Sequence, residues 1–276
     1  MAINRASIAK ELLPGLNAVF GLEYGDVDNE HAPLFEVENS DRAFEEEVLF
    51  TGFGTAPVKG EGAAVQYDDA QESFTARYTH ETISLAFAVT EEAMEDNLYD
   101  TFAKLRARGL ARAMANTKQV KAADVFNNGF NTAFVGGDGQ PLFSDSHPVV
   151  DGGTQDNDLD ATDLSEASLE ASLITISKAK DDRGILIGIR AESLHIPPDL
   201  AFTADQILNS TLSTTVTTQG SDGVTNVNDI NAIRNQGLVP GGFFVNHRFT
   251  DTNAWFLKTD APNGAKMFVR APLQTK

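Results

Sequence analysis

The chain has 276 residues, 41% of them hydrophobic, so it is long enough to bury a sizeable core as one large domain or two smaller ones. Its 40 acidic and 21 basic residues give a net charge of −19, which disfavours attraction to nucleic-acid phosphates or anionic membranes. The absence of cysteine excludes disulfides, thiolate metal sites and cysteine nucleophiles. Stability must therefore come from packing and association.

No continuous apolar segment indicates a signal peptide or a membrane span. Lys10, Glu11 and Pro14 interrupt the first twenty residues. Polar residues interrupt every later hydrophobic stretch before it reaches the roughly 20 residues that a bilayer requires. Residues 1–44 contain short apolar pieces separated by proline, glycine and asparagine. We interpret them as an extended arm, and we expect no membrane partner.

Residues 50–62 are rich in glycine and contain a proline, a composition typical of a loop or an edge strand. Gly52 and Gly54 begin a G-x-G pattern, but Pro57 stands where a third glycine would be needed, and no helical pattern follows. The segment therefore does not resemble a phosphate-binding loop, and we expect no cofactor.

Residues 74–89 alternate between apolar and mostly polar or small side chains, which is the period-two pattern of a β-strand. The alternation changes phase at Glu81 and Thr82, so a bulge or a change from one strand to the next is expected there. Without interruption the segment would extend for roughly 53 Å.

A helical pattern follows over residues 90–127. Thr90 is a suitable N-cap, and acidic residues precede basic ones along the segment, which matches the helix dipole. Apolar side chains recur at helical spacing at Met94, Leu98, Phe102 and Leu105. Gly109 weakens the helix, but a continuous one would be about 57 Å long. A compact sphere of this chain length measures only about 48 Å across, so we expect an elongated subunit.

The second half of the chain alternates helical and strand patterns, which predicts a mixed α/β unit. Asp163 and Glu166 form a D-x-x-E box that predicts the start of a helix ending at Gly184. Further predicted elements are buried strands (185–189, 193–196), a helix (199–209), a flexible loop (210–228), a short helix (229–236) and three strands (243–246, 254–258, 267–270).

Ser144, Asp145 and His147 are the residue types of a hydrolytic triad. Adjacent residues in one loop rarely orient into a relay, and the chain has neither a G-x-S-x-G elbow nor an H-E-x-x-H motif. We interpret His147, which precedes Pro148, as a turn residue that hydrogen-bonds locally, and we expect no catalytic residue. A metal-dependent hydrolase that uses His147 and the following acidic loop is the enzymatic alternative.

The acidic loop contains Asp151, Asp156, Asp158 and Asp160, and carboxylates at alternating positions are ligands that calcium prefers. Counted from Asp156, however, alanine occupies both the position that an EF-hand reserves for glycine and the one that it reserves for glutamate. We therefore interpret the segment as a solvated acidic loop without a metal. A structural cation at a contact between subunits is the alternative.

Four segments carry a resemblance to a known family. They are MANTKQVKAADVFNNGF (114–130), GGDG (136–139), SDSHP (144–148) and TDTNAWFLKTD (250–260). In this order they resemble one family of tailed-phage major capsid proteins that have the Hong Kong 97 fold. The similarity covers most of residues 45–272. Members usually continue beyond the point that corresponds to Lys276, so we expect a shortened or processed form.

The resemblance implies a Hong Kong 97-like α+β capsid fold in five parts. They are an N-terminal arm (1–44), an extension loop that forms a β-hairpin (45–89), a peripheral domain with a long spine helix (90–135), a mixed α/β axial domain (136–245) and strands that return to the peripheral domain (246–276). The elements predicted from residue patterns follow the same order.

The resemblance further implies a non-enzymatic major capsid protein that assembles with itself, as hexamers and pentamers, into an icosahedral shell around a phage double-stranded DNA genome. It would reside in the virion, and in the host cytoplasm during assembly. Portal, scaffold and decoration proteins are expected partners. Packaged DNA is a further expected, non-specific partner. We interpret the basic run from Lys104 to Arg112 as a solvated helix face, and contact with the packaged genome inside a capsid is the alternative. An encapsulin-like nanocompartment shell has the same fold and is the alternative.

The expected contacts between subunits lie on the extension loop. So long an arm has few neighbours in its own chain, and large side chains on it should be covered by adjacent subunits. Lys59 also lies near the presumed tip, although a covalent crosslink would need partners that one sequence does not reveal. The candidate contact residues are Phe53, Val58, Lys59, Phe74, Arg77 and Tyr78.

Overall fold

The computed structural model describes residues 6–88, 99–150, 152–159, 162–218 and 224–275. Its elements, in chain order, are α1 (Ala6–Gly25), β1 (Glu36–Asn39), β2 (Phe44–Phe50), β3 (Glu72–Thr79), α3 (Tyr99–Asn127), β4 (His147–Pro148), β5 (Thr154–Gln155), α4 (Glu166–Ser177), β6 (Ala191–Ile196), η1 (Pro198–Leu200), α5 (Ala201–Asn209), β7 (Leu212–Thr218), β8 (Val224–Ile230), α6 (Ala232–Gln236), β9 (Phe243–Val245), β10 (Phe256–Thr259) and β11 (Lys266–Val269).

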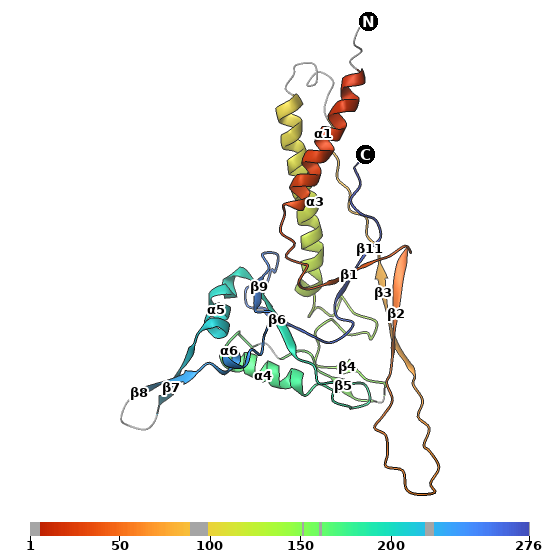
Figure 1. The fold of residues 1–276 in the computed structure, drawn as a ribbon, viewed down its shortest axis with the longest axis vertical. Coiled ribbons are helices and arrows are strands. Elements are labelled where there is room, and N and C mark those ends of the chain that lie inside the picture. The colour runs from red at the N-terminus through yellow and green to blue at the C-terminus, as the bar shows by residue number, and fades with distance from the viewer. Residues whose placement is uncertain (1–5, 89–98, 151, 160–161, 219–223, 276) are drawn as a thin grey trace.

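The subunit is elongated, as the sequence predicted. Helices α1 and α3 run along the long axis, a mixed body of helices and strands lies at one end of them, and the β2–β3 hairpin extends away from the body (Figure 1). The last residues of the chain return past β3 toward the helices (Figure 1). In this shape the extended hairpin projects from the rest of the subunit (Figure 1).

Helix α1 corrects the expectation of an extended arm at the start of the chain. Residues 6–25 are helical although Pro14 lies inside the segment. Proline removes one backbone donor, but packing against α3 outweighs that loss. Phe20 is buried, and Glu23 accepts a 2.6 Å hydrogen bond from Nε of Arg112 on α3.

Alanines are buried along the spine helix α3, which packs against α1, and of the predicted apolar stripe only Leu105 has a described burial. The buried positions repeat every four residues at Ala103, Ala107, Ala111 and Ala115. Small side chains let two helix backbones approach closely, so this face suits a helix partner. Leu105, which we expected in the apolar stripe, is 64% exposed. Thr90, Met94 and Leu98 lie outside the described residues.

The segment after α1 is fixed to the spine helix through a buried polar contact and an aromatic core. Nδ1 of His31 lies 3.0 Å from Oε1 of Gln119, and both residues are almost fully buried. Burial lowers the pKa of His31. The rings of Phe35 and Phe256 meet the ring of Phe126 at centroid distances of 5.7 and 5.3 Å. Strand β1 then pairs in parallel with β11.

Strands β2 and β3 form the predicted hairpin. They are antiparallel from the pair Phe44 and Thr79 to the pair Phe50 and Glu72. β3 ends at Thr79, just before the predicted change of phase, and residues 81–88 are not a strand. The second half of the predicted strand was therefore wrong over its described residues. We call residues 44–79 the extension hairpin and residues 51–71 its loop.

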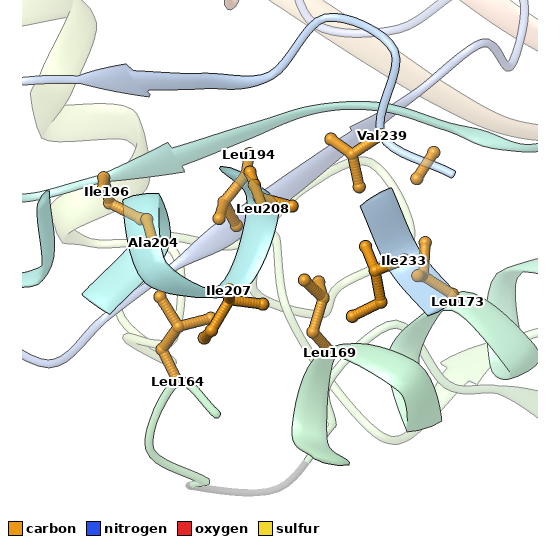
Figure 2. Packing of buried hydrophobic residues seen from close by; sticks show 11 residues of the cluster. Leu164, Leu169, Leu173, Leu194, Ile196, Ala204, Ile207, Leu208, Ile233 and Val239 are labelled. Carbon is orange, nitrogen blue, oxygen red and sulfur yellow. The ribbon is translucent and has the colours of Figure 1, made fainter. Parts of the chain in front are cut away.

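The body is built on a small sheet with strand order β10-β6-β9, in which β6 pairs antiparallel with β10 and parallel with β9. Apolar side chains from α4, α5, α6 and β6 meet beneath it (Figure 2). Leu169, Leu194 and Ile196 have no exposed surface there. His195, on β6, is also buried, lies 2.9 Å from the Ser193 hydroxyl, and stacks on Phe244 at 5.4 Å.

The predicted helix start in the body was two residues early. The N-cap of α4 is Ser165, whose hydroxyl accepts from the backbone N–H of Ser168 in a capping box. The helix ends at Ser177, not at Gly184, which instead adopts a φ of +78° in the following turn. Helix α6 and its C-cap Gly237, with φ +61°, match the prediction apart from a later start.

Two further predictions in the body were wrong. Ile185, Leu186 and Ile187 were expected in a buried strand but form one isolated bridge and are 37–62% exposed. Residues 210–228 were expected to be a flexible loop, but β7 and β8 pair there over seven positions. The predicted strands at 193–196, 243–246, 254–258 and 267–270 correspond to β6, β9, β10 and β11.

No helix within the described residues is long and apolar enough to cross a bilayer.

Candidate assembly surface

The base of the extension hairpin is fixed by polar contacts. Nζ of Lys266, on β11, contacts a carboxylate oxygen of Glu47 and lies 3.5 Å from Oε1 of Glu38. The Ser40 hydroxyl donates a 2.6 Å hydrogen bond to Oε1 of Glu45 and lies 3.0 Å from Nε2 of His80. Side chains from β1, β11 and β2, together with Ser40 and His80 beside the strands, therefore hold the base in place.

The turn at Gly137 supports β3 from another side. A Cβ at this position would overlap the backbone carbonyl of Thr75, so only glycine permits the approach. The neighbouring Asp138 accepts a 2.6 Å hydrogen bond from Nδ1 of His147. Burial raises the pKa of Asp138, but the hydrogen bond from His147 and one from the Gln140 backbone outweigh it, and the pKa is lowered.

The loop beyond this base exposes large apolar side chains. Tyr67 is 94% exposed, and Val58 has no cover at all. Other exposed apolar residues of the hairpin are Phe44, Val48, Leu49, Phe50, Phe53 and Val65. Large apolar side chains exposed in such number on one element often mark an interaction site. The loop therefore has the character of an interface with another chain.

The six candidate contact residues differ in how exposed they are. Phe53, Val58 and Lys59 are exposed on the loop. Phe74 is half-buried on β3.

Arg77 and Tyr78 have partners in their own chain. Nε of Arg77 lies 2.9 Å from Oε1 of Glu46, and its guanidinium lies over the ring of Phe44 at 4.1 Å. The Tyr78 ring meets Phe268 at 5.0 Å, and burial together with Glu47 raises the pKa of its phenol. These two residues help to fix the hairpin to its own subunit.

The comparisons with known proteins decide the family. A family model described as phage capsid protein matches residues 72–276, which is about three quarters of the chain. The chain belongs to the phage capsid protein family. A search of curated proteins by sequence finds no match.

Two solved capsid structures resemble this capsid protein. One is the capsid of bacteriophage JBD30 decorated with minor capsid protein trimers, with a TM-score of 0.57 at 14% identity; the match covers 81% of this chain and 92% of that chain. The other is the bacteriophage JBD30 capsid, with a TM-score of 0.56 at 12% identity and the same coverage. They confirm an α+β fold of the Hong Kong 97 type. The protein is a structural subunit that assembles with itself into the virion shell.

The distances around Ser144 and His147 do not support the alternative that this protein is a hydrolase. The Ser144 hydroxyl lies 3.2 Å from that of Ser146, while Nε2 of His147 lies 3.1 Å from Oδ1 of Asn157. His147 thus bonds to Asp138 and Asn157, which confirms its predicted local role.

The acidic loop is only partly described. Oδ1 of Asp156 accepts a 2.8 Å hydrogen bond from the backbone N–H of Asp158. Asp151 and Asp160 lie outside the described residues. Within the described part of the chain, no group of three or more histidine, aspartate or glutamate side chains could hold a metal ion.

The basic face of the spine helix is occupied in part by α1. Arg108 and Arg112 both pair with Glu23, Arg108 through Nε at 3.8 Å. Each exposed pair of this kind contributes little to stability, but it reduces the positive charge presented to a polyanion.

Sequence reasoning missed several exposed residues of the hairpin. Leu49, Phe50, Val65 and Tyr67 were not among the candidates, although all are at least 50% exposed. The signal was available at the end of β2, where Val48, Leu49 and Phe50 are consecutive apolar residues. A strand with only one covered face would alternate, so this run indicated a second covered face.

Proposed function

We propose that the extension hairpin of each subunit packs on an adjacent subunit, and that copies assemble in this way as hexamers and pentamers into an icosahedral shell around double-stranded DNA. The exposure of the loop's apolar side chains carries the proposal. Burying one such side chain is worth about 1.5–3 kcal/mol. Repeated at every contact, a few of them would dominate association between subunits that each carry −19.

A groove beside the spine helix is the surface on which we place the neighbour's loop. Residues 80–85, α3 and the strand β11 with the following residues line it. Phe134 and Val135 are 60% and 54% exposed there. Four basic residues (Lys118, Lys121, Lys266, Arg270) and two acidic ones (Glu81, Asp124) also line it, although Lys121 already pairs with Glu81 at 2.9 Å. The loop that would enter carries more acidic than basic residues. Apolar surface and opposite charge both favour the second copy as the occupant.

Charge limits the remaining partners. A subunit with net charge −19 repels DNA, and the pairing of Arg108 and Arg112 with Glu23 weakens the basic face. We therefore propose that contact with the packaged genome is weak and non-specific. Assembly in the host cytoplasm would involve scaffold and portal proteins, and the decorated JBD30 capsid supports a decoration protein as a further partner.

The experiment combines Phe53→Ser, Val65→Ser and Tyr67→Ser. The matched control, Lys59→Ser with Glu61→Ser, changes the same loop without changing apolar area or net charge. Size-exclusion chromatography with light scattering measures assembly, and circular dichroism measures folding. We expect the triple variant to fold and remain unassembled, and the control to form shells. Shells of normal mass and stability from the triple variant would refute the role of the loop.

A second set of variants tests the groove. Phe134→Ser with Val135→Ser should weaken assembly as the loop variant does. Because both sets remove the same contact, combining them should add less than the sum of their separate effects on the free energy of association. Fully additive effects would place the loop on another surface.

A further inference from the structure

Arg183 connects the body to both ends of the exposed loop. Its Nε donates to the backbone carbonyl of Gly52 at 3.2 Å. Its Nη2 donates to the backbone carbonyl of Asp69 at 3.0 Å and to Oδ1 of Asp68 at 3.1 Å. We call Gly52, Asp68 and Asp69 the mouth of the loop. One guanidinium thus binds both sides of the mouth.

The mouth is also closed by contacts within the loop. The backbone N–H of Gly54 donates to Oδ2 of Asp68 at 2.7 Å. Thr51 and Gln71 exchange hydrogen bonds of 2.9 Å, from the Thr51 backbone N–H to the Gln71 carbonyl and from the Gln71 backbone N–H to the Thr51 hydroxyl. Arg183 adds the hydrogen bonds that attach this closed mouth to the body.

The turn that carries Arg183 is itself well defined. Oδ1 of Asp181 accepts from the backbone N–H groups of Arg183 and Ile185, at 2.9 and 2.7 Å. Gly184 takes the positive φ that the turn requires. Nε2 of Gln155 donates to the carbonyl of Lys180 at 2.9 Å, which ties the turn to β5. The guanidinium is therefore presented from a rigid support, and its side chain is only 16% exposed.

The mouth residues are adjacent in sequence to two of the most exposed aromatic side chains. Phe53 follows Gly52, and Tyr67 precedes Asp68. Fixing the mouth residues therefore fixes the position of the backbone that carries Phe53 and Tyr67. We propose that Arg183 is a positioning residue for assembly, which orients the loop on its own subunit so that Phe53 and Tyr67 are presented before a neighbour arrives. This inference rests on the proposed function of the loop.

The physical reason is the entropy of association. A loop that must be ordered at the moment of contact adds that cost to every contact, whereas a preorganised loop does not. Arg183 belongs to neither of the two buried apolar clusters, so its loss should affect the loop without unfolding the subunit.

Arg183→Gln is compared with Arg42→Gln, which removes the same charge from an 80% exposed side chain. The chain has no cysteine, so Val58→Cys and Asp199→Cys can carry two spin labels, one on the loop and one on the body. Unassembled subunits, kept apart at low ionic strength, give the distance distribution between the labels. Light scattering gives the rate of assembly of Arg183→Gln and Arg42→Gln chains that lack the two label substitutions, because Val58 is itself a candidate contact residue.

We expect Arg183→Gln to broaden the distance distribution and slow assembly about tenfold, the effect of adding the ordering of one or two side chains to each contact. Its melting temperature should stay within about 2 °C of that of Arg42→Gln. Arg183→Lys, which cannot span three acceptors, should fall between the two.

The same distribution and rate in Arg183→Gln and Arg42→Gln would overturn the inference, and so would faster assembly. If Arg183→Gln does not fold, Asp68→Asn loosens the same contact from the loop side and is judged by the same outcomes. Failure of the proposed function would be seen in a different experiment. The variant with Phe53→Ser, Val65→Ser and Tyr67→Ser would then form normal shells, independently of the results for Arg183.

Discussion

Leu169 and Leu194 in the body have no exposed surface, whereas Val58 and Tyr67 on the extension hairpin are almost entirely exposed. Both regions are rich in large apolar side chains, but within the described part of the chain those of the body are buried and those of the hairpin loop are exposed. The body buries its residues between α4, α5, α6 and β6, and the loop has only polar contacts at its mouth.

The difference separates two contributions to the shell. Apolar residues of the body stabilise the folded subunit, and those of the loop stabilise contacts between subunits. Substitutions in the two regions should therefore affect different measurements, the free energy of unfolding for the body and the extent of assembly for the loop.

Leu194→Ala should have the largest effect on folding. The residue is fully buried on β6, and replacing a buried leucine by alanine costs about 3–5 kcal/mol through lost apolar contact and the cavity that remains. Urea denaturation of the unassembled subunit measures it. Tyr67→Ala is the control from the loop and should change the free energy of unfolding by less than about 0.5 kcal/mol. Equal effects would remove the distinction between the regions.

Acid should destabilise the body next most strongly. Burial and the nearby Lys258 lower the pKa of His195 to about 4. Below its unfolded pKa of about 6.5 the unfolded chain takes up a proton that the folded chain does not. Stability should thus fall as the pH drops from about 6.5 to 4, by about 3 kcal/mol in total. His31, whose pKa burial also lowers, adds to the same trend.

Denaturation at a series of pH values measures this loss. His195→Gln should flatten the profile. His247→Gln, which changes a 65% exposed side chain, should leave it in place. An unchanged slope in His195→Gln would show that another group is responsible.

His147→Ala should have a smaller effect. It removes the ring whose Nδ1 hydrogen-bonds to Asp138 and whose Nε2 lies 3.1 Å from Oδ1 of Asn157, and it leaves the carboxylate of Asp138, which is only 19% exposed, without that partner. The expected loss is about 1–3 kcal/mol, measured by thermal melting. The variant should lose no enzymatic activity, and a substrate turned over by the wild type alone would contradict the structural role.

A chelator should have the smallest effect. With the acidic loop solvated and holding no essential cation, chelation should leave the melting temperature and assembly unchanged. A large drop in melting temperature that calcium restores would contradict this interpretation and favour a cation bound by Asp156 and Asp158.

The sequence predicted elements whose pattern is local. Strands β3 and β6, helix α5 and the Gly237 cap follow from alternation, helical spacing and the left-handed conformation that glycine permits. The pairing of β3 with β2 was implied only by the family resemblance. His147 was correctly assigned because a histidine before proline in a polar turn has local partners.

The remaining elements depend on contacts that no local pattern shows. Helix α1 tolerates Pro14 because α3 supports it, and the alanine face of α3 is recognisable only once α1 is its partner. The hairpin of β7 and β8 has the composition of a loop, yet its two strands pair with each other. At the assembly surface, Arg183 and the mouth of the loop are more than a hundred residues apart in sequence.

The most direct measurement is a cryo-electron microscopy reconstruction of the assembled shell at a resolution that shows side chains. The account predicts that Phe53, Val65 and Tyr67 are buried against an adjacent subunit, in the groove beside its spine helix, while Arg183 still contacts Gly52 and Asp68 within its own subunit. A shell in which these side chains remain in solvent, or fold back on their own subunit, would contradict it.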